Sequence, residues 1–162
     1  MQRRIVTLKH GRVGVISDTH GLIRAQALAA LKSSELIIHA GDIGKADVLD
    51  SLNQIAPVLA IRGNNDRGPW TKGLADVLNL KINGIELQVI HNVNEIEGDP
   101  MEGKISVVIS GHSHKPSVIK RDEILFVNPG SAGPRRFKLP VSVGRINFAR
   151  KNLHAAIVEL KI

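Results

Sequence analysis

Two histidines, His112 and His114, follow an apolar run at residues 105–109 and have the type and spacing to hold a metal ion. Side chains two residues apart on an extended chain point the same way, so both imidazoles are expected to face one point beyond a buried strand. Imidazole nitrogens are common ligands of divalent metals. A chance pair bonded to the backbone would have the same spacing, so further ligands must come from elsewhere in the chain.

Composition restricts what such a metal could be. The chain has 162 residues and no cysteine, which excludes disulfides and thiolate ligands together. A metal must then be held by His, Asp, Glu, Asn or water, and these donors favour Mn, Fe, Co, Ni or Zn. Hydrophobic residues make up 43% of the chain and aromatic residues only 2%, so we expect one globular domain with an aliphatic core.

Charge and hydropathy bear on partners. No apolar run approaches the length of a membrane-spanning helix and no signal peptide is evident, so we expect a cytoplasmic protein with no membrane partner. The net charge of +7 would suit nucleic acid. Because the basic residues are scattered and the few aromatics form no stacking platform, a solvated basic surface is the favoured interpretation.

The first half of the chain alternates between two kinds of hydrophobic pattern. Short apolar runs that predict buried strands are separated by helical spacing, and this order is typical of a parallel sheet with crossover helices. We expect strands over 12–17, 35–40 and 57–62, helices over 22–32 and 46–55, and a loose lead-in over 1–11.

The second half is expected to be rich in strands. Asn83-Gly84 between two apolar runs is a strong signal for a two-residue hairpin turn. We predict the hairpin over 77–82 and 85–90, a short helix over 71–76, an irregular connection over 93–104, a strand beginning at 105, and antiparallel strands over 117–120, 124–127, 141–148 and 153–160. Residues 1–162 are thus expected to form one α/β domain.

Polar clusters directly follow five of the predicted strands. In α/β sheets, ligands gather beyond the carboxyl ends of the strands. Taken singly, these residues could cap helices or stabilise turns. Taken together, they predict one metal site, and the clusters are Asp18/His20, Asp42, Asn64, His91 and His112/His114.

This set of motifs resembles the calcineurin-like metallophosphoesterase superfamily, and within it the small YfcE-like phosphodiesterases. The resemblance runs from about residue 12 to the C-terminus. It implies a β-sandwich of two mixed sheets flanked by α-helices. The matching motifs are Asp18-x-His20, Gly41-Asp42, Gly63-Asn64-x-Asp66, His91, Gly111-His112-x-His114 and Asn128-Pro129-Gly130-Ser131.

The resemblance also implies roles for these residues. Asp18, His20 and His114 would hold one divalent ion and Asn64, His91 and His112 a second, with Asp42 bridging the two. Mn²⁺ is the expected ion, with Ni²⁺, Co²⁺, Fe²⁺ or Zn²⁺ as alternatives. The expected catalytic set is Asp42, Asn64, His112 and His114.

The implied activity is hydrolysis of phosphodiester bonds by hydroxide bound between two metal ions. The substrate would be a small phosphodiester or a nucleotide-like one, and homo-oligomers are common among such relatives. Two alternatives are a protein-interaction scaffold on the same fold, like the retromer subunit, and a nuclease. Because all seven ligand positions hold competent residue types, the enzyme is favoured.

One motif departs from the pattern common in the superfamily. Asn65 stands where many members have a histidine thought to protonate the leaving group, and an amide cannot act as an acid. Asp66 is expected to orient a turn, His39 to be buried behind the site, and residues 128–131 to give structural support. Asn92 replaces the glycine that usually follows the hairpin histidine.

Overall fold

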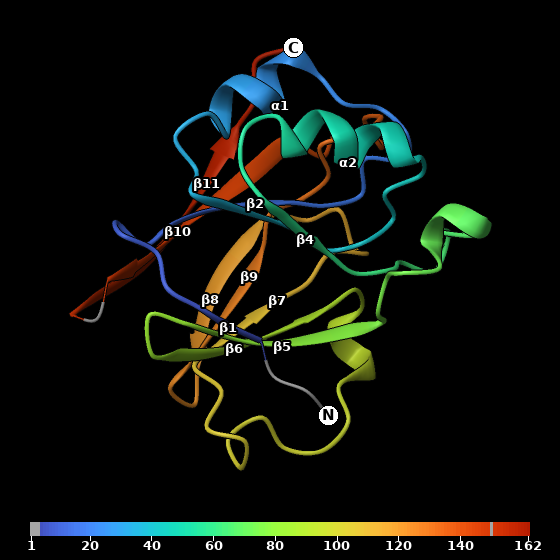
Figure 1. The fold of residues 1–162 in the computed structure, drawn as a ribbon. Coiled ribbons are helices and arrows are strands. Elements are labelled where there is room, and N and C mark those ends of the chain that lie inside the picture. Colours follow the sequence, from blue (N-terminus) through green and yellow to red (C-terminus); the bar gives the residue numbers. More distant parts are fainter. Residues whose placement is uncertain (1–3, 150) are drawn as a thin grey trace.

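The computed structural model describes residues 4–149 and 151–162, which fold into two mixed β-sheets packed face to face (Figure 1). Within the described residues, one sheet has six strands in the order β1-β5-β6-β7-β9-β8, and the other has five in the order β11-β10-β2-β3-β4. The two mixed sheets expected from the resemblance are confirmed.

The five-stranded sheet is built around three parallel strands, β2 (Arg12–Ile16), β3 (Leu36–His39) and β4 (Val58–Ala60). Helix α1 (Ala25–Ala30) joins β2 to β3, and α2 (Ala46–Asn53) joins β3 to β4. The predicted parallel arrangement is therefore confirmed. Helix α1 begins later than expected because the Leu22 amide closes a turn onto the Thr19 carbonyl.

The same sheet is completed by β10 (Ser142–Ala149) and β11 (Asn152–Glu159), which form a long antiparallel pair. Strand β10 also pairs antiparallel with β2, so the C-terminal part of the chain closes the sheet begun by the N-terminal part. This long-range pairing leaves no signal in local sequence patterns.

The six-stranded sheet contains the predicted hairpin with the predicted bounds, β5 (Val77–Ile82) and β6 (Ile85–Ile90). Asn83 and Gly84 both have positive φ, 48° and 82°, as a tight hairpin turn requires. The remaining members are β7 (Val107–Ile109), β8 (Ser117–Arg121), β9 (Ile124–Asn128) and β1 (Arg4–Val6).

Three expectations are corrected in this part of the chain. Residues 4–6, expected to be loose, form β1 and pair parallel with β5; residues 1–3 of the predicted lead-in lie outside the described range. Strand β9 pairs antiparallel with β8 but parallel with β7, so the C-terminal half is not uniformly antiparallel. A 3-10 turn, η1 (Pro69–Thr71), replaces the helix predicted over 71–76, and Ala75 bridges to Ile61 beside the sheet.

An aliphatic core fills the space between the two sheets, with Val15 and Ile38 from one sheet meeting Val89 and Ile109 from the other. A second cluster lies between α1, α2 and the outer face of the five-stranded sheet. Over the six-stranded sheet lies the connection 92–106, which contains only the 3-10 turn η2 (Val93–Glu95). No helix in the described range has the length or apolar character needed to cross a membrane.

Candidate metal centre

The candidate site lies where the carboxyl ends of strands from both sheets meet. Asp18 and His20 follow β2, Asp42 follows β3 and Asn64 follows β4. The six-stranded sheet contributes His91 after β6, and His112 and His114 after β7. The crevice predicted from the parallel strands is therefore lined from two sheets.

The first group comprises Asp18, His20 and His114, whose potential ligand atoms all lie within 4.8 Å of one another. The His114 Nε2 atom lies 3.3 Å from Asp18 Oδ1, and the His20 Nε2 atom lies 3.8 Å from the same oxygen. Asp18 is fully buried and His114 is 3% exposed. Chemically, this is a carboxylate with two imidazoles, a donor set suited to a divalent ion.

The second group comprises Asp18, Asp42 and His91. The His91 Nε2 atom lies 3.3 Å from Asp42 Oδ2 and 3.8 Å from Asp18 Oδ1. Asp42 Oδ2 is also 3.8 Å from His20 Nε2, so the Asp42 carboxylate lies between the two groups. This is the position that a bridging ligand would occupy.

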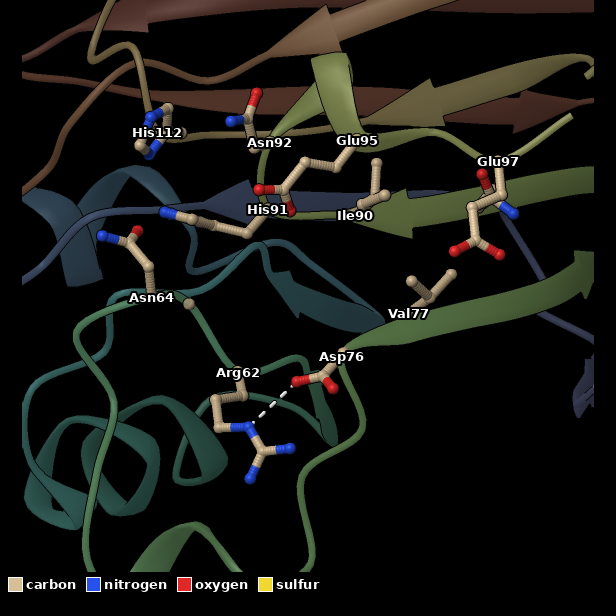
Figure 2. Close-up of a pocket in the computed structure, with 12 residues that line it drawn as sticks. Arg62, Asn64, Asp76, Val77, Ile90, His91, Asn92, Glu95, Glu97 and His112 are labelled. Atoms are coloured by element: carbon tan, nitrogen blue, oxygen red, sulfur yellow. Dashed lines mark hydrogen bonds and ion pairs between the residues drawn. The ribbon is translucent and has the colours of Figure 1, made fainter.

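Asn64 and His112 form the outer side of the centre. The His112 ring lies edge-on to that of His91, with 5.3 Å between centroids, and Asn64 lines the same cavity as both histidines. Both Asn64 and His112 are exposed, unlike the buried carboxylates. All seven predicted residues thus surround one region, which Figure 2 shows from the side of Asn64, His91 and His112.

The expected extended geometry of His112 and His114 is wrong. Their φ angles are 71° and 64°, and the Ser113 amide bonds to the Gly111 carbonyl in a tight turn. The two rings therefore diverge: His114 lies 5.5 Å from the His20 ring, and His112 faces His91. Left-handed backbone is strained for residues with a Cβ, and such strain is often concentrated at functional sites.

Strained backbone angles, and chain segments packed very closely against each other, occur at several positions in the centre. Asp18, His20 and Asp42 also have positive φ, between 46° and 56°. A Cβ on Gly63 would collide with the Asp42 amide and carboxylate, and one on Gly111 would collide with Ser17 and Asp18. Glycine is needed at these two positions because neighbouring chain segments approach so closely.

Specific donors hold each carboxylate in place. Asp18 Oδ2 accepts hydrogen bonds from the Ser17 hydroxyl at 2.7 Å and from the His112 amide at 3.0 Å. Asp42 accepts from the Asn65 amide at 2.9 Å and from its side chain at 3.1 Å. Asn65 thus orients the central carboxylate. From the sequence, Asn65 was predicted only to be unable to act as an acid. No role was predicted for Ser17, although it adjoins Asp18.

The surroundings favour the ionised carboxylates. Burial by itself raises the pKa of Asp18, but the nearby His114 ring, the bond from Ser17 and the charge of a protonated His91 outweigh it, so the pKa is lowered. The pKa of Asp42 is also lowered, because the neighbouring His91 ring, when protonated, and the bonds from Asn65 overcome its burial. Both side chains therefore offer negatively charged oxygens to a cation.

His91 is fixed in the tautomer that a metal ligand needs. Its Nδ1–H donates to the Ala40 carbonyl at 2.7 Å, so Nε2 of the neutral ring carries a lone pair toward the carboxylate oxygens. Burial lowers the pKa of His91, but a protonated ring would also bond to Asp42 through Nε2–H while keeping its bond to Ala40, so the pKa is raised. The lone pair on His91 Nε2 and the carboxylate oxygens of Asp42 and Asp18 repel one another. A proton on Nε2 relieves this repulsion, and a divalent ion bound between these atoms would do the same.

Buried atoms without hydrogen-bond partners support this interpretation. Among the described residues they include Asp18 Oδ1 and one ring nitrogen each of His20, His91 and His114. Buried polar atoms are normally paired. The unpartnered Nε2 atoms of His20 and His91 each lie 3.8 Å from Asp18 Oδ1, whereas the unpartnered His114 nitrogen is Nδ1 and its Nε2 approaches Asp18. The residues present therefore fit a centre of divalent ions.

A layer of buried hydrogen bonds supports these loops from beneath. The Asp66 carboxylate accepts from the amides of Gly63, Ile43 and Gly44 at 2.9–3.1 Å, which ties the loop after β3 to that after β4. Asp66 therefore orients a turn, as predicted. Asn128 donates to the Gly111 carbonyl at 3.0 Å, in keeping with a supporting role for residues 128–131.

His39 links the loop after β2 to the loop after β3. The Thr19 hydroxyl donates to the Ile43 carbonyl at 2.8 Å, so the contact at 3.0 Å between Thr19 and His39 Nε2 must use an Nε2–H donor. His39 Nδ1 accepts from the Gly41 amide at 3.1 Å. Complete burial lowers the pKa of His39 to about 4, in accord with this neutral tautomer. The predicted burial behind the site is confirmed.

A cavity of about 960 Å³ opens from the outer side of the centre. In Figure 2, Asn64, His91 and His112 lie at one end, and Val77, Asp76 and Glu97 lie toward the other. Arg62 and Asp76 form an ion pair of 2.9 Å in its wall. The cavity gives a substrate access to the centre.

Known proteins are similar to this chain in both sequence and fold. Residues 12–151 match the profile of the calcineurin-like phosphoesterase superfamily domain. A probable metallophosphoesterase of Methanothermobacter thermautotrophicus is 33% identical over 159 residues, covering 91% of each chain. A probable metallophosphoesterase of Methanocaldococcus jannaschii is 39% identical over 132 residues, covering 74% of this chain and 67% of the relative.

Solved structures include two kinds of neighbour. A structure described as a novel archaeal phosphodiesterase superposes with a TM-score of 0.75 at 23% identity, covering 91% of this chain and 99% of its own. Vps29 of Chaetomium thermophilum superposes with a TM-score of 0.73 at 15% identity, covering 92% and 96%. At these identities the structural matches establish only the fold, whereas the sequence profile and the relatives above 30% identity establish the family. The chain belongs to the calcineurin-like phosphoesterase superfamily.

Proposed function

We propose that this phosphoric ester hydrolase is a phosphodiesterase that works with two divalent ions, Mn²⁺ being the expected species. The observation that carries the proposal is the pair of adjoining donor groups with unpartnered buried atoms. Asp18, His20 and His114 would hold one ion, Asn64, His91 and His112 the other, and Asp42 both. Curated relatives are named phosphodiesterases, including YfcE of Escherichia coli at 26% identity.

Two bound ions would supply Lewis acidity for the phosphoryl oxygens and lower the pKa of a bridging water, which is the basis of the dinuclear hydroxide mechanism. The protein's contribution is preorganisation. Ser17 and the His112 amide orient Asp18, Asn65 orients Asp42, and the Ala40 carbonyl fixes the His91 ring. Such supporting contacts typically affect metal affinity or activity about 10–100-fold.

Charge balance favours a phosphate ester as the substrate. Formally, two carboxylates against two divalent ions leave a charge of about +2 on the centre. An anionic diester would reduce this surplus, and the exposed side chains of Asn64 and His112 leave the outer side of the centre open to it. The amide of Asn65 cannot protonate a leaving group, so esters with good leaving groups should react fastest.

The test is hydrolysis of bis(4-nitrophenyl) phosphate by protein that has been treated with chelator and then given Mn²⁺, Ni²⁺, Co²⁺ or Zn²⁺. Activity should be absent after chelation and return with Mn²⁺. The matched comparison is 4-nitrophenyl phosphate, which has the same leaving group but only one ester bond. Absence of diester hydrolysis with every ion would refute the proposal.

An interaction scaffold is the second candidate, because Vps29 structures from several organisms superpose on this chain. A scaffold has no need of a complete ligand set, whereas all seven candidate positions here carry competent donors. The hydrolysis test separates the two functions directly. A chain that binds the ions but hydrolyses none of the esters would favour the scaffold.

A further inference from the structure

The cavity beside the metal centre differs in charge from the protein as a whole. The chain has a net charge of +7, yet the described residues that line this cavity include three carboxylates and one guanidinium. The carboxylates belong to Asp76, Glu95 and Glu97, and the cation is Arg62. The cavity wall therefore carries a formal charge of −2 within a basic protein.

Of the four charged residues that line the cavity, only Arg62 and Asp76 form an ion pair within the described range. Arg62 Nε lies 2.9 Å from Asp76 Oδ1, so these charges largely compensate each other. Neither Glu95 nor Glu97 forms an ion pair with any residue in the described range, and both are exposed. Both come from the connection after β6, and Figure 2 shows them with Ile90 and Val77 among the lining residues.

A second observation ties this wall to a ligand. The candidate ligands Asn64, His91 and His112 line the same cavity as the glutamates, and the buried Nε2 atom of His91 is directed at Asp42 and Asp18. A group bound at the centre therefore has direct access to the acidic wall. Ile90 and Val77 also line this cavity and offer apolar surface of the kind that methyl or methylene groups contact.

We propose that this cavity binds one ester substituent of the substrate and selects substituents that carry an organic ammonium group. This inference rests on the proposed phosphodiesterase function. The phosphate would face the metal centre, the carbon chain would contact Ile90 and Val77, and the cation would lie beside Glu95 and Glu97. A nucleic acid chain would instead bring phosphates toward these carboxylates, which opposes a nuclease function.

The test compares ligands of matched shape. Choline phosphate and its carbon isostere, 3,3-dimethylbutyl phosphate, differ only in the charge of the quaternary centre, and 2-carboxyethyl phosphate places a carboxylate there. Dissociation constants for the Mn²⁺-loaded protein are measured by calorimetry. We expect choline phosphate to bind about fivefold more tightly than the isostere, as two partly screened carboxylates permit, and the carboxylate ester to bind most weakly.

Variants of the two glutamates test whether these carboxylates cause the difference in affinity. Glu95→Gln with Glu97→Gln should bring the ratio between choline phosphate and its isostere close to one, and Glu97→Lys should favour the carboxylate ester. Glu102→Gln changes an exposed glutamate of the same connection that does not line the cavity, so it should retain the wild-type ratio. An equal affinity of the wild-type protein for the two isosteres would overturn the inference.

Hydrolysis of bis(4-nitrophenyl) phosphate, measured in parallel, separates the two proposals. If this diester is hydrolysed and the affinity ratio is one, the charge selection is refuted while the phosphodiesterase function stands. If no diester is hydrolysed with any ion, the phosphodiesterase function fails, and the inferred substrate class fails with it. Tighter binding of a single-stranded oligonucleotide than of choline phosphate would contradict the selection and favour a nuclease.

Discussion

The two halves of the candidate centre differ in how firmly the protein holds them. In the inner half, Asp18 and His114 are at most 3% exposed, and both oxygens of Asp18 face specific neighbours. In the outer half, Asn64 and His112 are exposed beside a large cavity. An enzyme needs both properties, since one half must hold its ion while the other must admit substrate.

Asp42 joins these halves, because its carboxylate lies within 3.8 Å of both His20 and His91. Its two oxygens also receive bonds from Asn65. The loops that carry the halves are tied together underneath by Asp66 and His39. The predictions below proceed from the residue shared by both halves to the buried network behind them.

Replacement of Asp42 should have the largest effect. Asp42→Asn keeps the side-chain shape but removes the negative charge between the ions, where several kcal/mol of stabilisation is expected. We expect kcat/KM for bis(4-nitrophenyl) phosphate to fall by about 10³-fold. Asp50→Asn, at an exposed position of α2, is the control and should leave the rate unchanged. Near-normal activity of Asp42→Asn would show that Asp42 is not shared by the ions.

Substitutions of His112 and of His114 should each weaken metal binding in a different half of the centre. His112→Ala is expected to empty only the outer position, leaving about one Mn²⁺ per chain instead of two, because the buried donors of the inner half remain. His114→Ala should weaken the inner position instead. Metal content after gel filtration, measured by mass spectrometry, checks this. Loss of both ions from His112→Ala would mean that the halves cannot be occupied separately.

Asp66 should matter more for folding than for chemistry. Asp66→Ala removes an acceptor from three backbone amides in the buried region between two loops, and charged acceptors contribute about 1.5–3 kcal/mol each. We expect the free energy of unfolding in urea to fall by about 4 kcal/mol, after allowance for non-additivity. The Asp50 variant again serves as the control. A loss below about 1 kcal/mol would show that water replaces the carboxylate readily.

His39 should make the chelator-treated protein sensitive to acid. Its folded pKa of about 4 lies below the ordinary 6.5, so the unfolded state binds more protons between these values. The stabilisation is therefore complete above pH 6.5 and is lost as the pH falls toward 4, by up to about 3 kcal/mol. Urea unfolding across this range measures the slope.

A variant isolates the contribution of His39 from those of other titrating groups. His39→Gln retains a donor and an acceptor but does not titrate, so it should flatten the slope, whereas His154→Gln at an exposed position should not. His91, whose pKa is raised, is protonated in both states through most of this range and so contributes little to the slope. An unchanged slope in His39→Gln would assign the acid sensitivity elsewhere.

Local sequence patterns predicted those features that depend on neighbours in the chain. The hairpin at Asn83-Gly84 is formed with the predicted strand bounds, and β2, β3 and β4 are parallel as the alternating pattern indicated. The clustering of polar residues after strands also led to one site, because parallel strands end at a common edge.

Patterns that depend on distant partners were not predictable in the same way. Residues 4–6 became a strand because β5 offered an unpaired edge, and the antiparallel contact of β10 with β2 joins segments over 100 residues apart. The turn at residues 111–114 is imposed by packing of Gly111 against Ser17 and Asp18. Extended geometry was expected there because the sequence does not record that contact.

The residue types by themselves determined the chemistry open to this protein: carboxylates, imidazoles and an amide without any thiolate define which ions it can hold. Only the tertiary structure decided how these donors are divided, sending His112 toward His91 and His114 toward His20. It also assembled the acidic cavity wall from segments around residues 62, 76 and 95–97. Donor chemistry resides in single side chains, whereas distances and local charge arise when separate segments pack together.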